Sequence, residues 1–312
     1  MTAPLLLGDP EVRARLTPAD AVAAVRHALL AHHAGQLSAP PRVRAPLASR
    51  ELVFTVGELS ADGLYGFRAY DAGHHGTQLV AVWERASGEL AAVVHGAELG
   101  PRRTGAIGAV AVEALARRDA SRIGLIGTGP QAWTQLWALS AGPLRRAEVA
   151  VFGRRTERAE RFAARARDEL GLSARVAGSA REAVAGREVV IVATDSATPV
   201  LEADWVAPGT HLSTLGPKST TRYEIPPELA ARATVLVTDS RAQAGRYGAD
   251  HLLGPAPMAE LGAVLAGAAP GRTGDEDITL FSSVGLAGTE VAVAAALAAA
   301  CGPPRTEDLG AG

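Results

Sequence analysis

Lysine and cysteine are almost absent from this chain of 312 residues. Cys301 is the single cysteine, so an internal disulfide framework is excluded, and this usage is typical of a reducing cytoplasm. Of the 31 basic side chains, only Lys218 is a lysine. Because the chain favours arginine so strongly, an arginine in place of an expected lysine carries little information. A lysine that is retained marks a position of interest.

Strong charge and long apolar runs are also lacking. The formal net charge is −2 and the sequence pI is about 6.5, so no basic field points to nucleic acid or an anionic membrane. Leu5–Leu7 is too short for a signal-peptide core, and Val291–Cys301 is too short to span a bilayer. No His, Cys, Asp or Glu spacing suggests a metal site. We expect a soluble, cytoplasmic protein without a nucleic-acid or membrane partner.

A glycine-rich turn is the most informative motif that is present. An apolar run of strand type, 122–126, leads into Gly127-Thr128-Gly129-Pro130-Gln131-Ala132, and apolar residues then recur at helical spacing to residue 139. Strand, glycine turn and helix in this order are the context of a dinucleotide fingerprint, and Ala132 is a tolerated replacement for its third glycine. Pro130 suits the first helical turn, whose free N–H groups would face the phosphates. The motif predicts a pyrophosphate site.

The residues after the second expected strand, 148–152, indicate which cofactor binds. An NAD site would have an acidic residue here for the ribose 2′-hydroxyl, whereas this chain has Gly153 followed by arginines. Arginine pairs with phosphate oxygens bidentately, which favours NADP(H) and leaves NAD possible. Arg154 is the first choice for the 2′-phosphate, with Arg155 and Arg158 beside it. The alternative is that these arginines form only a solvated helix start.

Two patterns divide the chain. A capped helix over 17–34 and strands at 52–56, 64–70, 78–84 and 90–94 predict a first α+β domain, 1–117, which the C-terminal helix 286–312 completes. From residue 122 onward, strands near 122–126, 148–152, 188–194, 210–215 and 234–238 alternate with helices. Such alternation predicts an α/β protein with a Rossmann-type, doubly wound parallel sheet over 118–285.

Several short motifs follow one another along most of the chain. They are Arg103-Thr104-Gly105-Ala106, Leu115-Ala116-Arg117, the glycine turn, Val192-Ala193-Thr194-Asp195-Ser196, Pro208-Gly209-Thr210-His211 and Phe281-Ser282-Ser283-Val284-Gly285. In this order they resemble the ornithine cyclodeaminase/mu-crystallin family, which also contains ketimine and Δ1-pyrroline-2-carboxylate reductases and archaeal-type alanine dehydrogenases. The resemblance implies a homodimer whose first domain binds substrate and dimerises. It also places Thr194, Ser196, Val284 and Gly285 beside the cofactor.

The resemblance further implies that basic residues of the first domain clamp the substrate carboxylate, here Arg42 and Arg103. Arginine suits the task because its planar fork meets a carboxylate with two parallel hydrogen bonds. Where the family usually has lysine in a Gly-x-Lys segment, this chain has Gly66-Phe67-Arg68, so Arg68 is a candidate for both substrate binding and catalysis. Arg42 and Arg103 have the alternative interpretation of solvated surface charges.

Lys218 is the sharper departure from the family pattern. Where the family has Gly-Ala-Asp, with a catalytic acid, this chain reads Gly216-Pro217-Lys218. A lysine ammonium would repel the δ-ammonium of ornithine unless Glu58, Asp71 or Glu224 compensates. Lys218 is therefore a candidate proton donor to an imine nitrogen, with an exposed, inactive loop lysine as the alternative.

Together these features predict an NADP(H)-dependent oxidoreductase acting on the C–N bond of a small α-imino or α-amino acid, of the ketimine or pyrroline-carboxylate reductase type. Two alternatives remain open. One is an ornithine cyclodeaminase-type lyase with tightly bound NAD, and the other is a non-catalytic NADPH-binding protein of mu-crystallin type.

Overall fold

The computed structural model describes residues 3–73, 76–254 and 257–302 and separates into two compact units. The first unit contains residues 1–103 and 287–312, and the second contains residues 104–286. The boundary between them falls inside helix α3 (Leu99–Leu115), whereas the sequence placed it after residue 117. Among the described residues, no helix combines the length and apolarity needed to cross a membrane.

The first unit packs helices against one face of a sheet. Its strand order is β1-β7-β6-β5-β4-β2, with β3 paired to β4. Its elements are β1 (Leu5–Leu7), α1 (Asp9–Arg15), α2 (Pro18–His33), β2 (Leu37–Ser38), β3 (Val43–Pro46), β4 (Glu51–Leu59), β5 (Leu64–Asp71), β6 (Gln78–Glu84), β7 (Leu90–Gly96) and α10 (Thr289–Cys301). Helix α2 begins where the sequence predicts, because the Thr17 hydroxyl accepts a hydrogen bond from the Asp20 N–H at 3.1 Å.

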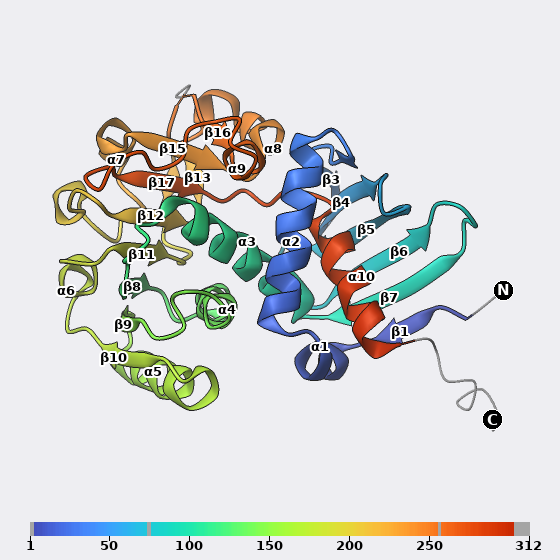
Figure 1. The fold of residues 1–312 in the computed structure, drawn as a ribbon, viewed down its shortest axis with the longest axis horizontal. Helices are drawn as coiled ribbons and strands as arrows, with labels where there is room; N and C mark the ends of the chain where they lie inside the picture. The colour runs from blue at the N-terminus through green and yellow to red at the C-terminus, as the bar shows by residue number, and fades with distance from the viewer. Residues whose placement is uncertain (1–2, 74–75, 255–256, 303–312) are drawn as a thin grey trace. The chain divides into compact units, whose positions relative to one another are not determined.

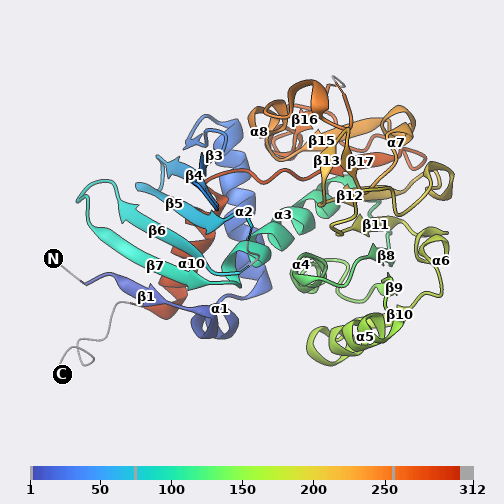
Figure 2. The same ribbon diagram turned by 180° about the vertical axis from the view of Figure 1, so that it is seen from behind.

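Helix α10, from the other end of the chain, lies beside α2 against strands β4 to β7 (Figure 1). Seen from behind, these strands lie in front of α10 (Figure 2). The approach is close, because a Cβ atom on Gly57 of β4 would come within 2.3 Å of the Gly288 Cα. Alternation along β4 turns Val53, Thr55 and Leu59 inward, so these side chains are buried under the helices.

The second unit is a parallel sheet in the order β10-β9-β8-β11-β12-β17-β15-β16. Its strands are β8 (Arg122–Ile126), β9 (Glu148–Phe152), β10 (Ser173–Val176), β11 (Val189–Val192), β12 (His211–Thr214), β15 (Val235–Thr238), β16 (Ala259–Glu260) and β17 (Thr279–Ser282). Its longer helices are α4 (Pro130–Leu139) and α5 (Thr156–Leu170), and its short helices are α6 (Ala180–Val184), α7 (Glu228–Arg232), α8 (Arg241–Gly245) and α9 (Leu261–Leu265). A small hairpin pairs β13 (Lys218–Ser219) with β14 (Arg222–Tyr223).

The Rossmann-type fold class is confirmed by this strand order. From β8 the chain moves outward to β9 and β10, and then returns to β11 on the other side of β8. The order reverses between β8 and β11, and the carboxyl ends of strands at such a point are where open α/β sheets bind ligands. Buried Ile126, Val190 and Leu212 belong to the apolar core of the unit.

Candidate functional site

The glycine turn lies at the carboxyl end of β8, at the reversal point. Gly127 has φ +126°, and a Cβ atom there would come within 2.2 Å of the Ala193 carbonyl oxygen, so only glycine fits. Gly129 is the N-cap of α4, and no side chain caps that helix. A Cβ atom on Gly129 would meet nothing within 4 Å. The first turn of α4 therefore has free N–H groups with open space before them, which fits a pyrophosphate.

The arginines after β9 border a surface cavity. This cavity has a volume of about 710 Å³ and is lined by Arg155, Thr156, Glu157, Arg158 and Arg161. Arg154 directly precedes these residues in the chain and is exposed. The lining carries three guanidinium groups and one carboxylate, so it is a basic concavity at the end of the second strand. That surface fits a phosphate better than a ribose hydroxyl.

Glu224 organises the carboxyl ends of β11 and β12. Its fully buried carboxylate accepts hydrogen bonds from the backbone N–H and hydroxyl of Thr194, both at 2.8 Å, and from the Thr214 hydroxyl at 2.7 Å. The backbone N–H groups of Leu215 and Gly216 also donate to it. Ser196 is half-buried and donates its N–H to the Thr194 hydroxyl at 3.3 Å. One carboxylate thus fixes both the loop after β11 and the loop after β12.

Asp239, directly after β15, fixes the segment that follows β17. It accepts hydrogen bonds from the Ser283 hydroxyl at 3.1 Å and from the N–H groups of Val284 and Gly285, both at 2.8 Å. These two N–H groups are therefore already engaged, and Asp239 fixes the backbone of this segment.

Lys218 is buried, with a relative exposure of 4%. Its Nζ donates to the Gly216 carbonyl oxygen at 2.6 Å, and its own carbonyl accepts from the Leu252 N–H at 2.7 Å. His251 is buried next to this hairpin, and its Nδ1 accepts from the Leu253 N–H at 3.2 Å. Burial and the Lys218 ammonium both lower the pKa of His251, so its imidazole is neutral at neutral pH.

The first unit contains a second buried polar cluster, centred on Glu290 of α10. Glu290 Oε1 accepts from Arg68 Nη1 of β5 at 3.3 Å and from Arg103 Nη2 of α3. It also accepts from the Thr55 hydroxyl of β4 at 3.3 Å. Arg68 Nε donates to Gln78 Oε1 of β6 at 2.7 Å. Two of the three arginines expected to bind substrate therefore meet at one carboxylate.

Glu290 remains ionised in this cluster. Burial opposes ionisation, but the charges of Arg103 and Arg68 outweigh it and hold the pKa of the carboxyl below its ordinary value. Two guanidinium groups against one carboxylate leave one positive charge in excess. Arg42, the third arginine, is half-buried in the same unit, directly before β3.

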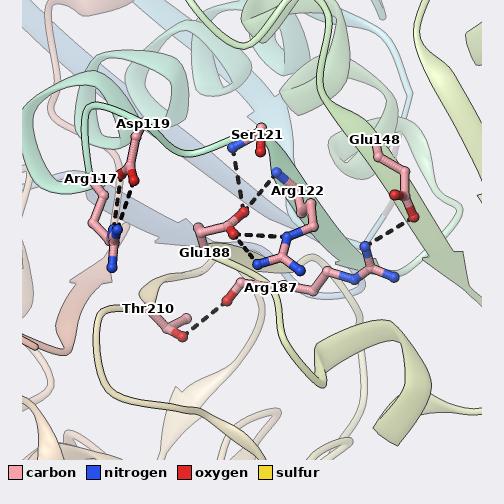
Figure 3. Close-up of polar contacts among 8 residues, drawn as sticks. All are labelled: Arg117, Asp119, Ser121, Arg122, Glu148, Arg187, Glu188 and Thr210. Carbon is pink, nitrogen blue, oxygen red and sulfur yellow. Dashed lines mark hydrogen bonds and ion pairs between the residues drawn. The ribbon is translucent and has the colours of Figure 1, made fainter. Parts of the chain in front are cut away.

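The opposite, amino edge of the second unit's sheet is occupied by structural ion pairs (Figure 3). Glu188 accepts from the Arg122 N–H and from Arg122 Nε, both at 2.8 Å. Arg187 pairs with Glu148 at 3.1 Å (Figure 3). Within the described ranges, no group of three or more His, Cys, Asp or Glu residues is arranged to hold a metal ion. In the second unit, the polar groups that are candidates for cofactor binding therefore lie at the carboxyl edge of the sheet.

Glu290 and Asp239 were missed by the sequence reasoning, and Glu224 was considered only as a counter-charge. A signal for Glu290 existed, because it is the one charged residue in the apolar segment 289–301. A lone acid in such a helix is expected to be paired when buried.

Comparisons with known proteins agree with this arrangement. The chain is 34% identical over 209 residues to the ketimine reductase mu-crystallin of Mus musculus, covering 67% of this chain and 64% of that protein. It is 30% identical over 311 residues to an alanine dehydrogenase of Archaeoglobus fulgidus, covering 93% and 92%. The alignment with the mouse protein thus spans less than two thirds of that protein's length.

Among solved structures, the Δ1-pyrroline-2-carboxylate reductase of Thermococcus litoralis, in complex with NADH and L-proline, matches with a TM-score of 0.85 and 26% identity. The match covers 95% of this chain and 97% of that one. The iminosuccinate reductase of Paracoccus denitrificans, in complex with NAD+, matches with a TM-score of 0.84 and 28% identity, and covers 96% of each chain. The profile of the ornithine cyclodeaminase/mu-crystallin family matches residues 4–299. This chain belongs to the ornithine cyclodeaminase/mu-crystallin family, whose members bind nicotinamide cofactors.

Proposed function

We propose that this chain is an NADP(H)-dependent reductase of small α-imino acids, of the ketimine or pyrroline-carboxylate type. The observation that carries the proposal is the pair of Arg103, which is buried, and Arg68, which is mostly buried, because their single counter-charge leaves one positive charge to bind a substrate carboxylate. The similarity to reductases of ketimines and pyrroline carboxylates supports the same reaction class.

The cofactor is held by the second unit. Gly127, Thr128, Gly129, Pro130 and Gln131 receive the pyrophosphate at the first turn of α4, where space is open. The 2′-phosphate binds among Arg154, Arg155 and Arg158. Thr194, Ser196, Val284 and Gly285 lie at the nicotinamide end, in loops that Glu224 and Asp239 fix. When bound, the reduced nicotinamide supplies the hydride for the substrate's imine carbon.

The residues of the chain orient the substrate and supply a proton. Arg42, Arg68 and Arg103 bind the carboxylate and hold the planar imine in one orientation, which provides much of the rate. The carbon of the C=N bond gains a hydride and the nitrogen gains a proton, so the product is an amine. Lys218 Nζ, or a water beside it, donates that proton, and its contact with the Gly216 carbonyl fixes the position of the ammonium.

Cyclodeamination is disfavoured because the three carboxylates that could bind an ornithine ammonium already have partners within the chain. Glu224 is surrounded by its five donors, Glu58 pairs with Arg85 at 3.3 Å, and Asp71 pairs with Arg50 at 3.2 Å. None of these three replaces the family's acid at position 218. A second ammonium beside Lys218 would be repelled.

We also propose a homodimer formed through the outer face of the first unit's sheet. Phe54, Tyr65, Phe67 and Trp83 make a continuous aromatic cluster on this face, with ring centroids 5.7–6.4 Å apart along the series. Val56 and Leu79 are on the same face and 39% exposed. A contiguous apolar patch of this kind is typical of a protein interface, and a related archaeal alanine dehydrogenase is a dimer with bound NAD.

The test is turnover by the purified full chain. We expect NADPH oxidation with Δ1-pyrroline-2-carboxylate, or with a keto acid plus an amine, and a larger kcat/KM for NADPH than for NADH. Conversion of ornithine and NAD+ to proline and ammonia would contradict the proposal in favour of a cyclodeaminase. Tight NADPH binding with no turnover across the panel would contradict it in favour of a non-catalytic binding protein.

A further inference from the structure

Glu290 is a buried carboxylate whose place the chemistry of the cofactor site does not explain. It lies in the first turn of α10, and its side chain is 1% exposed. The rest of that helix, from Val291 to Cys301, is entirely apolar. Burying a carboxylate with two guanidinium groups requires the desolvation of three charges, and a well-packed apolar cluster is often at least as stable. Stability alone is therefore a poor reason for this arrangement.

The geometry of the contacts points to a different role. A single oxygen, Oε1, accepts from Arg68, Arg103 and Thr55, which belong to β5, α3 and β4. One acceptor thus determines the distance between two guanidinium groups that come from separate elements. Glu290 Oε2 is buried and has no hydrogen-bond partner among the residues that the structure describes, so the carboxylate is not oriented as a bidentate structural pair.

The remaining contacts restrict Arg68 further. Its Nε donates to Gln78 Oε1, and its guanidinium carbon lies 4.2 Å from the centre of the Tyr70 ring. With Nη1 on Glu290, the plane and direction of this fork are determined, and Nη2 makes no hydrogen bond to any described residue. Such pre-ordering lowers the entropic cost of binding a carboxylate.

We propose that Glu290 is a positioning residue for substrate recognition: it fixes the guanidinium groups of Arg68 and Arg103 in one arrangement and reduces their joint charge to +1, so that the pair accepts one carboxylate group. The inference rests on the proposed function, because it assigns these arginines to substrate binding. The inference limits the substrates to acids that present one carboxylate group to Arg68 and Arg103.

The experiment compares Glu290→Asp and Glu290→Gln with the wild-type chain. Glu290→Asp keeps the charge and moves the oxygens back by one methylene, so it is the smaller perturbation of the buried cluster. Glu169→Gln is the matched control, because it removes an exposed carboxylate whose partner is Arg165 at 2.8 Å. The probe is pyrrole-2-carboxylate, a planar and unreactive ring acid, titrated calorimetrically in the presence of NADP+. NADPH affinity is measured in parallel by fluorescence.

We expect the affinity for the probe to fall about tenfold in Glu290→Asp, because small displacements of binding groups are costly. It should also fall in Glu290→Gln, because a neutral amide no longer holds two like-charged guanidinium groups together. NADPH affinity should stay within about twofold, and where substrate is turned over KM should rise more than kcat falls. Unchanged probe binding in Glu290→Asp overturns the inference, as does a wild-type chain that fails to bind the probe. A chain that binds the probe in this Glu290-dependent way without turnover contradicts the proposed function and leaves the inference standing.

Discussion

Arg68 and Glu290 are 222 residues apart in the chain and form a partly buried ion pair at 3.3 Å. This contact joins the middle of the first unit's sheet to the last helix, and Arg103 completes it from α3. The cluster therefore depends on three segments folding together. It links the stability of the first unit to the chemistry proposed for it.

Replacement of Arg103 should affect both properties. In Arg103→Gln the Glu290 carboxylate keeps one cationic partner, Arg68, and breaking a buried pair costs about 3–5 kcal/mol of unfolding free energy. We expect a loss of that order in urea denaturation and a KM for the imino acid raised about 100-fold. Arg102→Gln is the control, since this neighbour pairs instead with Glu98 at 3.1 Å. Equal effects of the two variants on KM would argue against a role for Arg103 in substrate binding.

The two glycines of the turn should respond differently to alanine. At Gly129 the methyl group meets no protein atom within 4 Å, so Gly129→Ala should change stability by less than about 1 kcal/mol. It should weaken NADPH binding about tenfold or more, since the methyl group enters the space needed for the pyrophosphate. Gly127→Ala, which combines φ +126° with a 2.2 Å clash, should lose about 2–4 kcal/mol of stability. Thermal unfolding and cofactor titration separate the two effects. A Gly129→Ala chain that binds NADPH normally would exclude this turn as the cofactor site.

The arginine-lined cavity should determine the choice of cofactor. We expect Arg155→Ala and Arg158→Ala to weaken NADPH binding about 10- to 100-fold each, because each removes a charge-assisted contact worth about 1.5–3 kcal/mol. NADH, which has no 2′-phosphate, should be almost unaffected. Arg181→Ala, at an exposed arginine of α6 in the same unit, is the control. Parallel losses of NADPH and NADH affinity would show that the cavity does not bind the 2′-phosphate.

His211 should make the second unit sensitive to acid. It is fully buried between the Thr279 hydroxyl at 2.9 Å and the Ser213 hydroxyl at 3.0 Å, and burial together with Arg272 lowers its pKa to about 3. Between about pH 3 and pH 6.5, the His211 imidazole is therefore neutral in the native state and protonated in the unfolded chain. The stability that His211 confers is complete above about pH 6.5 and is lost as the pH falls towards 3.

The slope of that loss is about 1.4 kcal/mol per pH unit for one proton. His211→Gln removes the titrating group, so its unfolding free energy should fall less steeply over this range than that of the wild-type chain. Urea denaturation at pH 7, 6, 5 and 4 provides the comparison. Parallel pH profiles for the two proteins would contradict the assignment of this slope to His211.

The aromatic outer face of the first unit should carry the dimer. Val56→Glu introduces a charge into this face and should convert the dimer to a monomer in light scattering, because an unpaired buried charge costs several kcal/mol. Leu30→Glu, a similar change at a 37% exposed residue of α2, should leave the assembly intact. A Val56→Glu chain that elutes as an unchanged dimer would place the interface elsewhere.

Local patterns in the sequence determined much of the fold. The Thr17 cap, the glycine turn and the alternation of strands and helices from residue 122 each have a local physical cause, and the structure has the corresponding elements. Helix α3 begins at Leu99, in a region of the sequence that contains no cap signal. The short strands β16 and β17 were not predicted, since their pairing is parallel and non-local.

The amino-acid sequence by itself determined the family, the glycine turn and the arginines after β9, because these depend on neighbouring residues. Only the tertiary structure decided that Arg68 and Arg103 share the Glu290 carboxylate, and that Glu224 is enclosed by its own hydrogen-bond donors. The reason is physical: the ionisation state and orientation of a buried charge depend on which distant groups replace its water. That information lies in packing, and local sequence patterns do not contain it.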